Sequence, residues 1–365
     1  MIYLDNGATS FHKPPEVRRA VVQTMLRCAN PGRGGHKPAM AAAEQVYACR
    51  EAAGRLFHCD PEQVVLTSNC THGLNIAIRT LVAPGDNVVI SGFEHNAVTR
   101  PLYALGAHVT VAGRRLFDQS DTLEAFETAL KRGAKAAVFT HASNVFGYIL
   151  PVAGMAQLCR QYGVPFIIDG AQSAGILPID LENLGADFIA MPGHKGLLGP
   201  QGTGLLLCNR LPEPLMHGGT GSASMEQTMP DFLPDRAEAG TLNVPGIGGL
   251  TAALGYLRRT GIASIARREQ EQLSRCIRGL EKLGFHPFKG ANQLGIISFL
   301  PGMDCEEAAG RLAKRGIAVR AGLHCAPLAH ESAGTLATGT VRVSFGHDAN
   351  AFQTDSFLAA AATLR

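Results

Sequence analysis

Two residues of this chain have the types and the spacing needed to hold an aldehyde cofactor. Lys195 lies in the glycine-rich turn 191–200, and Asp169 ends the apolar run 164–169. In many enzymes a lysine amine in such a turn forms a Schiff base with pyridoxal 5'-phosphate. A carboxylate at a strand end then pairs with the pyridinium nitrogen, which lets the ring accept electrons. Either residue alone is commonplace, but the pair predicts a pyridoxal phosphate enzyme.

A phosphate group could be held where a strand is followed by the helical pattern 71–81. The first backbone N–H groups of a helix, together with the Thr71 hydroxyl, attract anions. The simpler interpretation is that Thr71 only caps the helix. Gly73 stands alone there, so the segment does not resemble the glycine-rich loop that binds nucleoside triphosphates.

Three polar residues that follow other strands complete a candidate cofactor site. His95 follows the run 87–91 and could stack on a planar ring and move protons, although helix capping is the simpler role. Asn144 and Gln172 could hydrogen-bond the phenolic oxygen of the ring. All three would lie at the carboxyl ends of strands, where open α/β sheets bind their ligands.

The chain has nine cysteines, an odd number, and no Cys-x-x-Cys pair. This usage predicts neither a disulfide framework nor a metal site, and it favours the reducing cytoplasm. Most of the nine should be buried apolar residues. Cys325 differs, because it lies beside His324 in the glycine-containing loop 319–327, where a thiol can ionise and attack.

Short apolar runs alternate with helical patterns through the first part of the chain. The runs are apolar throughout, which is typical of strands in a parallel sheet covered on both faces. The alternation predicts a doubly wound, mostly parallel α/β domain. The expected strands are 64–67, 87–91, 136–140, 164–169, 187–191 and 204–208, and the clearest helices are 71–81, 123–132 and 152–162.

The sequence changes in character after about residue 212. Segment 217–224 is too rich in Gly and Ser for a regular element, and a helical pattern then covers 247–283 with a break near Gly261. Further strands are expected at 295–299 and 340–345. This mixture predicts a smaller α+β domain. The expected division is a large domain of residues 14–246 and a small domain of residues 1–13 and 247–365.

Composition argues against several classes of protein. The formal net charge is only +3 and no block of like charges occurs, so no nucleic-acid partner is expected. No apolar run approaches the roughly 18 residues of a membrane span, and the N-terminus shows no secretory signal. A Rossmann dehydrogenase is excluded because no Gly-x-Gly-x-x-Gly follows the first strand.

Seven short motifs occur along the chain in this order: Leu4-Asp-Asn-Gly-Ala-Thr9, Asn30-Pro-Gly-Arg-Gly-Gly-His36, Glu94-His-Asn96, Ser143-Asn-Val-Phe-Gly147, Asp169-Gly-Ala-Gln172, Gly193-His-Lys195 and Arg320-Ala-Gly-Leu-His-Cys-Ala326. Together they resemble the class V aminotransferase family, which belongs to fold type I of the pyridoxal phosphate-dependent transferases. The resemblance is to the cysteine desulfurase and selenocysteine lyase branch of that family, and it covers nearly the whole chain.

The resemblance implies a role for each residue of the candidate cofactor site. Lys195 would be the Schiff-base lysine, Asp169 the partner of the pyridinium nitrogen, and His95 the residue that stacks on the ring. Asn144 and Gln172 would face the phenolic oxygen and the substrate.

The resemblance also implies how the phosphate is held. Thr71, His72 and His194 would surround it, and Thr241 lies in a segment through which a partner subunit reaches it. A homodimer with shared active sites is therefore expected. Two residues depart from the family pattern: Pro192 stands where many relatives have a Ser or Thr phosphate ligand, and His72 replaces a residue that is often acidic or neutral.

For the reaction itself, the resemblance implies a cysteine desulfurase that converts L-cysteine to L-alanine. Cys325 would take the sulfur as a persulfide, with Lys195 and His95 moving protons, and a sulfur-acceptor protein is a further expected partner. Arg342, the lone charge in an apolar strand, would clamp the substrate carboxylate through a bidentate pair. The implied substrate contacts are Asn144, Arg342, Arg320 and His36.

Other functions stay open on the sequence alone. L-selenocysteine as the substrate would require the same residues. A class V transaminase or another lyase would act on a different amino acid, and Cys325 would then be incidental. A non-catalytic sulfur-relay protein that has kept the fold would form no Schiff base at Lys195.

Overall fold

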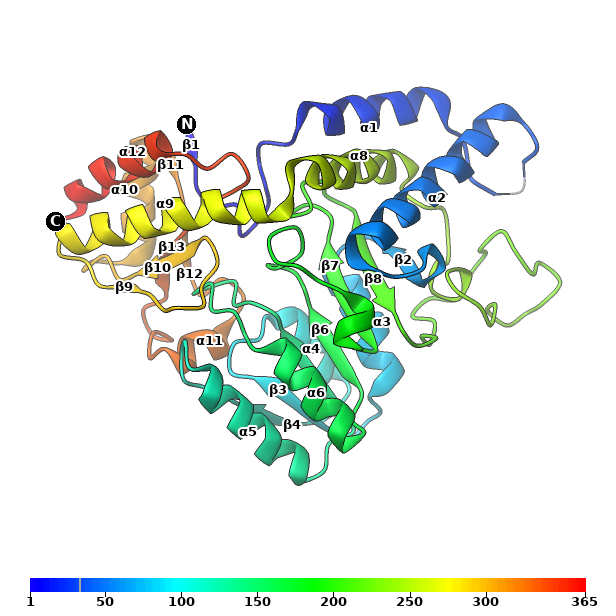
Figure 1. Cartoon of the computed structure of the whole chain (residues 1–365), viewed down its shortest axis with the longest axis horizontal. Helices are drawn as coiled ribbons and strands as arrows, with labels where there is room; N and C mark the ends of the chain where they lie inside the picture. The colour runs from blue at the N-terminus through cyan, green and yellow to red at the C-terminus, as the bar shows by residue number, and fades with distance from the viewer. Residues whose placement is uncertain (33) are drawn as a thin grey trace.

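The computed structural model describes residues 1–32 and 34–365. Within these residues the largest sheet has seven strands, and all of them except β8 run parallel (Figure 1). From one edge to the other the strands are β2 (Val64–Thr67), β8 (Gly204–Cys208), β7 (Phe188–Pro192), β6 (Phe166–Asp169), β5 (Ala136–Thr140), β3 (Asn87–Ser91) and β4 (His108–Ala112). The mostly parallel α/β sheet expected from the unbroken apolar runs is confirmed.

Apolar side chains project from both faces of this sheet. On β3, Val88 and Ile90 pack beneath α3 (Cys70–Leu81) and α4 (Asn96–Ala104), while Val89 points into the core on the opposite face. The helices whose apolar residues enter that second core include α1 (Pro15–Arg27), α2 (Lys37–Phe57), α5 (Gln119–Lys131), α6 (Val152–Tyr162), α7 (Leu181–Leu184) and α8 (Val244–Thr260). Burial on both faces therefore fixes the sheet between two helical layers.

A second, antiparallel sheet lies in the C-terminal part of the chain. Its strands are, in order, β12 (Arg320–Gly322), β13 (Thr340–Ser344), β10 (Ile296–Phe299) and β9 (Pro287–Phe288). Helices α9 (Ile262–Lys282), α10 (Cys305–Lys314) and α12 (Ala351–Ala361) share a core with it, and α11 (Pro327–Ser332) follows the loop that carries Cys325. Strand β1 (Ile2–Tyr3) pairs in parallel with β11 (Ile317–Ala318), so the N-terminus joins this part of the molecule.

Most of the elements expected from the sequence are confirmed. The helical pattern 247–283 is indeed two helices, α8 and α9, separated at Gly261, whose φ is +80°. Strand β4 is missing from the prediction, because His108 and its two successors are exposed on this edge strand and show no buried apolar pattern. The predicted domain boundary at residue 246 lies within α8, which packs against α1 and α2. The division into domains stays a prediction.

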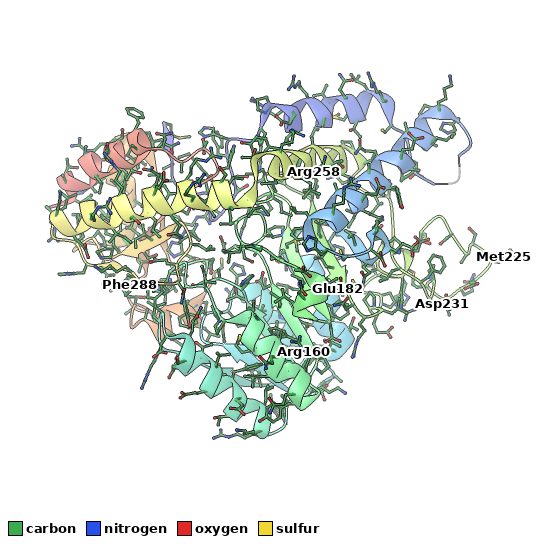
Figure 2. The ribbon with its side chains drawn as sticks, viewed as in Figure 1. Arg160, Glu182, Met225, Asp231, Arg258 and Phe288 are labelled. Atoms are coloured by element: carbon green, nitrogen blue, oxygen red, sulfur yellow. The ribbon has the colours of Figure 1, made fainter. Side chains whose placement is uncertain are left out.

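The segment 209–243 runs outward from the large sheet before α8 begins, and Figure 2 shows Met225 and Asp231 far out on it. Met225 is 96% exposed and Phe232 is 47% exposed. The short 3-10 helices of the chain are Pro61–Gln63, Asp235–Ala237 and Ala362–Leu364. Among the helices that the structure describes, none combines the length and apolar character needed to cross a membrane.

Candidate active site

A cavity of about 230 Å³ lies at the carboxyl-terminal edge of the large sheet. Its walls come from residues that follow β3, β5, β6 and β7 and from the first turn of α3. Asp169 and Lys195 both line it, as the parallel order of β6 and β7 predicts. We call this space the cofactor cavity. Its other polar wall residues are Asn69, Cys70, Thr71, His95, Thr140, Asn144, Gln172 and His194.

Lys195 follows β7 in a turn that is fixed by backbone hydrogen bonds. The N–H of Gly193 donates to the carbonyl of Thr203 at 2.8 Å, and the N–H of Gly199 donates to the carbonyl of Gly193 at 2.7 Å. Burial lowers the pKa of the Lys195 amine, and the nearby charge of Asp169 opposes this shift in part. The environment thus shifts the amine toward its neutral form, which is the nucleophilic one.

Asp169 is 2% exposed and ends β6. One of its oxygens, Oδ1, accepts a hydrogen bond from the N–H of Ala171 at 2.9 Å and another from the thiol of Cys70 at 3.3 Å. Burial is the main cause that raises the pKa of the Cys70 thiol, and the nearby charge of Asp169 raises it further. Cys70 therefore stays a protonated donor. The sequence alone does not point to Cys70, because its type does not distinguish it from the other buried cysteines.

His95 occupies a position that is compatible with both of the roles considered from the sequence. It is the N-cap of α4, and its Nδ1 accepts a hydrogen bond from the N–H of Ala97 at 3.0 Å. The same ring lines the cofactor cavity. Burial lowers the pKa of His95, while Asp169 raises it in part. The neutral ring with Nδ1 as acceptor carries its proton on Nε2.

The first turn of α3 corrects the simpler interpretation of Thr71. The N-cap is Asn69, whose side chain accepts a hydrogen bond from the N–H of His72 at 2.9 Å, and Thr71 is free to line the cofactor cavity. The Nδ1 of His72 accepts a hydrogen bond from the N–H of Ser68 at 3.3 Å. His72 lines a neighbouring cavity of about 150 Å³ instead, and Thr241 lines that same cavity. The structure thus brings Thr71, but not His72 or Thr241, to the cofactor cavity.

Arg342 lies on β13 beside the cofactor cavity and is only 2% exposed. Its Nη1 donates to the backbone carbonyl of Asn144 at 2.8 Å, and its Nη2 donates to Oδ1 of Asp5 at 2.6 Å. The other oxygen of Asp5 accepts a hydrogen bond from Nε of Arg320, a half-exposed residue, at 3.0 Å. The side-chain amide of Asn144 in turn donates to the carbonyl of His324 at 2.7 Å. Asp5 therefore joins two of the expected substrate residues, Arg342 and Arg320, and no local sequence pattern predicts this role.

Two further predicted residues contact the N-terminal segment 5–13. The amide of Gln172 donates to the carbonyl of Gly7 at 3.0 Å, and Nδ1 of His194 lies 3.1 Å from the Thr9 hydroxyl. The pKa of His194 is lowered to about 4, mainly by burial and in part by the charges of Lys195 and Lys13. Its ring is therefore neutral near pH 7.

The predicted substrate contact His36 lies elsewhere in the fold. It is the N-cap of α2, and its Nδ1 accepts a hydrogen bond from the N–H of Ala39 at 3.4 Å. The residue is exposed and is not part of the cofactor-cavity wall that the structure describes. Its proposed contact with the substrate stays a prediction.

Cys325 is the only exposed cysteine of the nine. Both it and His324 have left-handed backbone conformations, with φ of +56° and +52°, which are rare for residues other than glycine. The carbonyl of Cys325 accepts a hydrogen bond from the N–H of Asn96 at 2.8 Å, at the first turn of α4. Cys325 lines a recess of about 360 Å³ along α3 and α4, which we call the outer recess. His95 and Thr71 line both the outer recess and the cofactor cavity.

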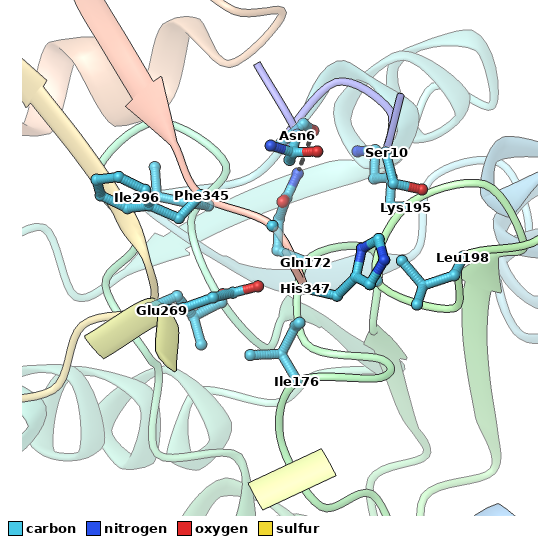
Figure 3. Close-up of a pocket in the computed structure, with 14 residues that line it drawn as sticks. Asn6, Ser10, Gln172, Ile176, Lys195, Leu198, Glu269, Ile296, Phe345 and His347 are labelled. Carbon is cyan, nitrogen blue, oxygen red and sulfur yellow. Dashed lines mark hydrogen bonds between the residues drawn. The ribbon is translucent and has the colours of Figure 1, made fainter. Parts of the chain in front are cut away.

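A smaller cavity of about 40 Å³ shares Gln172 and Lys195 with the cofactor cavity (Figure 3). Glu269 of α9 extends its carboxyl group into it, near His347 and the apolar side chain of Ile176 (Figure 3). Burial raises the pKa of Glu269 to about 8, although Arg268 lowers it in part. We call this space the Glu269 cavity.

Several known proteins are similar to this chain over most of its length. The probable cysteine desulfurase of Pyrococcus abyssi is 32% identical over 369 residues, which cover 94% of this chain and 89% of that protein. The cysteine desulfurase of Escherichia coli (strain SE11) is 34% identical over 89% of this chain and 84% of its own length. The apo structure of the cysteine desulfurase from Thermococcus onnurineus NA1 matches with a TM-score of 0.89 at 31% identity, covering 98% and 93% of the two chains. The model of the family Aminotransferase class-V matches residues 2–357, and the chain therefore belongs to the class V aminotransferase family.

Proposed function

We propose that this protein is a pyridoxal phosphate-dependent cysteine desulfurase, which converts L-cysteine to L-alanine and transfers the sulfur to Cys325. The observation that carries the proposal is the connection between two spaces. The cofactor cavity contains Lys195 and Asp169, and through His95 it adjoins the outer recess, where Cys325 is exposed. The names of the relatives described above support the same activity.

The residues of the cofactor cavity fit pyridoxal phosphate. Lys195 offers an amine whose pKa is lowered by burial, and Asp169 offers a carboxylate fixed by two donors. His95 would lie against the ring, and Thr71 with the first N–H groups of α3 would hold the phosphate. When bound, the cofactor supplies an electron sink for the carbon that loses its proton.

The remaining predicted cofactor contacts have supporting roles. Gln172 and Asn144, both buried at the cavity wall, would hydrogen-bond the ring's phenolic oxygen and the substrate. His194 would offer a neutral ring near the phosphate, because its pKa is lowered to about 4. In a homodimer, His72 and Thr241 would act from the adjoining cavity, with Thr241 reaching the phosphate of the other subunit.

Arg342 would bind the substrate carboxylate. Its Nε is buried and has no hydrogen-bond partner among the residues that the structure describes, whereas both terminal nitrogens are already held by Asp5 and Asn144. An unpaired buried donor of this kind is costly unless a ligand satisfies it. A substrate carboxylate would accept a hydrogen bond from this N–H, with Arg320 and His36 as further contacts from the surface.

The residues can move the protons and the sulfur in an order set by their positions. The neutral Lys195 amine takes the proton from the α-carbon of L-cysteine, and Nε2 of His95 supplies a second proton site. The Cys325 thiolate then attacks the substrate sulfur. A sulfur–sulfur bond forms, the carbon–sulfur bond breaks, and its electron pair stays on the carbon fragment, which is protonated and leaves as L-alanine.

The assembly, compartment and domain limits belong to the same proposal. We place the protein in the cytoplasm as a homodimer, and its sulfur passes on to an acceptor. The exposed apolar residues Val22, Met25 and Leu26 on α1, with Met225 and Phe232 on the outward segment, support a subunit interface.

The domains are proposed to be a large domain of residues 14–246 and a small domain of residues 1–13 and 247–365. L-selenocysteine is a second candidate substrate, because the same residues would serve it.

One experiment tests the proposal. The wild type, Lys195→Ala and Cys325→Ala are each loaded with pyridoxal phosphate and compared by visible absorbance and by alanine released from L-cysteine. We expect Lys195→Ala to lack the visible absorbance band and both variants to lose alanine formation by at least roughly a hundredfold. Cys28→Ala serves as the control, because Cys28 is a partly exposed cysteine remote in sequence from Cys325.

Each contrary result has a distinct meaning. Full alanine formation by Cys325→Ala contradicts the persulfide role, and it favours a lyase or transaminase in which Cys325 is incidental. A wild type without the visible band contradicts the cofactor role of Lys195, and it favours a non-catalytic relay protein.

A further inference from the structure

The outer recess lies on the solvent side of Cys325. Its floor is formed by α3 and α4, and its wall includes Asn75, Arg79, Asn96 and Arg100 together with Cys325. Cys325 is anchored here by the hydrogen bond from the N–H of Asn96. The side of Cys325 that faces this recess is therefore the one from which an incoming molecule would approach a sulfur atom carried by the thiol.

The charge of the outer recess is positive. Arg79 and Arg100 are exposed, and neither takes part in an ion pair in the part of the chain that the structure describes. Among the described residues, the wall of the recess includes no Asp or Glu. The carboxamides of Asn75 and Asn96 add hydrogen-bond donors. Two unpaired guanidinium groups in one concave space attract anions more strongly than the same groups on a flat surface.

We propose that the outer recess binds a small thiol that carries carboxylates, and that this thiol is the acceptor of the sulfur from Cys325. The proposal rests on the proposed function, because it requires a persulfide on Cys325. The volume of about 360 Å³ lies at the lower end of the range for small-molecule sites, and the recess is open enough to admit such a molecule from solvent. Carboxylates would pair with Arg79 and Arg100 and so bring the thiol sulfur toward Cys325.

The transfer step balances without an added oxidant. The acceptor thiolate attacks the outer sulfur of the Cys325 persulfide. A sulfur–sulfur bond forms on the acceptor, and the bond between that outer sulfur and Sγ of Cys325 breaks. Cys325 leaves as a thiolate and takes a proton from solvent, so the acceptor departs as a persulfide and the enzyme is ready for another turnover.

The test compares three thiols of different charge. The protein is loaded with pyridoxal phosphate, charged with L-cysteine and freed of excess substrate. It is then mixed with mercaptosuccinate, 2-mercaptoethanol or cysteamine at equal thiolate concentrations. The loss of persulfide from Cys325 is followed by mass spectrometry, with each rate divided by the amount of persulfide formed. We expect mercaptosuccinate to discharge the persulfide roughly tenfold faster than 2-mercaptoethanol, as two weak ion pairs would give, and cysteamine to be slowest.

The arginine variants identify the source of this preference. We expect R79Q combined with R100Q to reduce the preference for mercaptosuccinate to about twofold or less, and 0.5 M salt to act in the same direction. The control R132Q removes an exposed arginine at the end of α5, away from the recess, and should keep the preference.

Three outcomes would overturn the proposal. The first is equal rates for the three thiols, the second is a preference that survives R79Q with R100Q, and the third is discharge by an acidic protein but by none of the small thiols. A wild type that forms no persulfide on Cys325 is distinguishable from all three, because it contradicts the proposed function itself.

Discussion

Arg342 carries a full positive charge inside the protein, and its partners explain why the fold tolerates it. Asp5 balances the charge at 2.6 Å, and the carbonyl of Asn144 takes a second N–H. Burial lowers the pKa of Arg342, and Asp5 opposes that shift. Among the described residues, Nε is the one nitrogen of this guanidinium group that has no hydrogen-bond partner. A guanidinium group that is fixed by two partners and keeps an unpaired Nε–H is a rigid donor for a carboxylate oxygen.

Replacing Arg342 by lysine should therefore weaken substrate binding more than catalysis. The ammonium group can keep its pairing with Asp5, but it cannot also present a second, fixed N–H. We expect R342K to lower kcat/KM for L-cysteine by roughly tenfold to a hundredfold, mainly through KM. Steady-state kinetics with L-cysteine and with its methyl ester, which lacks the carboxylate charge, would measure this effect.

The matched control is R320K, because Arg320 also contacts Asp5 but is half exposed. Its effect on KM should be no more than a fewfold. If R342K discriminates between L-cysteine and the ester as well as the wild type does, and its melting temperature is unchanged, Arg342 does not bind the carboxylate.

At the residue scale, the sequence predicts side chains whose type is itself a chemical signal. Lys195, Asp169 and Cys325 stand out because an amine, a carboxylate and an unpaired thiol occur where turns or strand ends expose them. Asp5 and Cys70 do not stand out. Their roles depend on partners at positions 342 and 169, and no local pattern encodes such distant contacts.

The turn that carries Lys195 depends on its glycines for close packing. A Cβ on Gly196 would lie 2.4 Å from the backbone carbonyl oxygen of Ala174, and a Cβ on Gly193 would lie 2.1 Å from the Thr203 hydroxyl oxygen. From the other side, the carbonyl of His194 accepts hydrogen bonds from the N-terminal segment 5–13. The lysine is thus placed by backbone contacts on both sides of the turn.

Substituting Gly196 by alanine should displace the turn, because a backbone carbonyl cannot move aside as a flexible side chain can. We expect G196A to lower the occupancy of pyridoxal phosphate, the kcat by at least roughly tenfold, and the melting temperature by several degrees. Visible absorbance, kcat and thermal unfolding measure the three effects.

Gly310 provides the control, since a Cβ there would meet no atom within 4 Å. It lies within α10, so G310A should leave absorbance and kcat unchanged and raise stability by up to about 1 kcal/mol. Unchanged absorbance and kcat in G196A would show that the turn does not position the lysine.

Elements with a buried pattern are predictable, and exposed or mutually dependent ones are not. Helix α6 matches its predicted limits because its apolar spacing is regular and Gly163 ends it in a left-handed conformation. The N-cap of α3 is misassigned, because both Asn69 and Thr71 can cap a helix and only the tertiary structure selects one.

At the scale of the whole molecule, the Glu269 cavity lies where α9 of the C-terminal part meets the turn of Lys195. Glu269 is 5% exposed, and the wall of its cavity combines the apolar Ile176, Leu294 and Ile296 with polar residues that include His347 and Lys195. Its pKa is raised to about 8 by burial, so the carboxyl group is largely neutral at pH 7. The junction is therefore sensitive to alkaline pH.

Whether stability rises or falls with pH follows from the pKa of Glu269 in the folded and in the unfolded chain. In the unfolded chain a glutamate ionises near its ordinary pKa of about 4.3, whereas in the folded chain it holds its proton up to about pH 8. The stability that Glu269 contributes is thus fully present below about pH 4.3 and is lost as the pH rises through 8. The substitution E269Q keeps the shape and removes the titration.

We expect the free energy of unfolding of E269Q, minus that of the wild type, to rise by on the order of 3 kcal/mol between pH 5 and pH 8 and then to level off. Urea unfolding at several pH values measures this difference. E271Q alters an exposed glutamate on the same helix and should show a constant difference. A constant difference for E269Q as well would mean that Glu269 ionises normally in the folded protein.

The overall architecture is the most predictable level of this protein, because the alternation of strands and helices leaves few arrangements. The mostly parallel sheet and the smaller α+β part are both found. The alternation does not predict that the N-terminal strand pairs with a strand of the C-terminal part. Strand β1 is only two residues long, and its pairing with β11 is chosen by burial of Leu4 in the C-terminal core.

That pairing has a consequence for biosynthesis. During translation, Ile2 must wait for Ile317 to leave the ribosome before the two can pair, and Asp5 must wait for Arg342. Contacts between such distant positions form late, since closing a long loop is entropically costly. Nascent chains that have already built the central sheet would still lack a finished substrate pocket, so the enzyme would gain its competence only as the last strand is released.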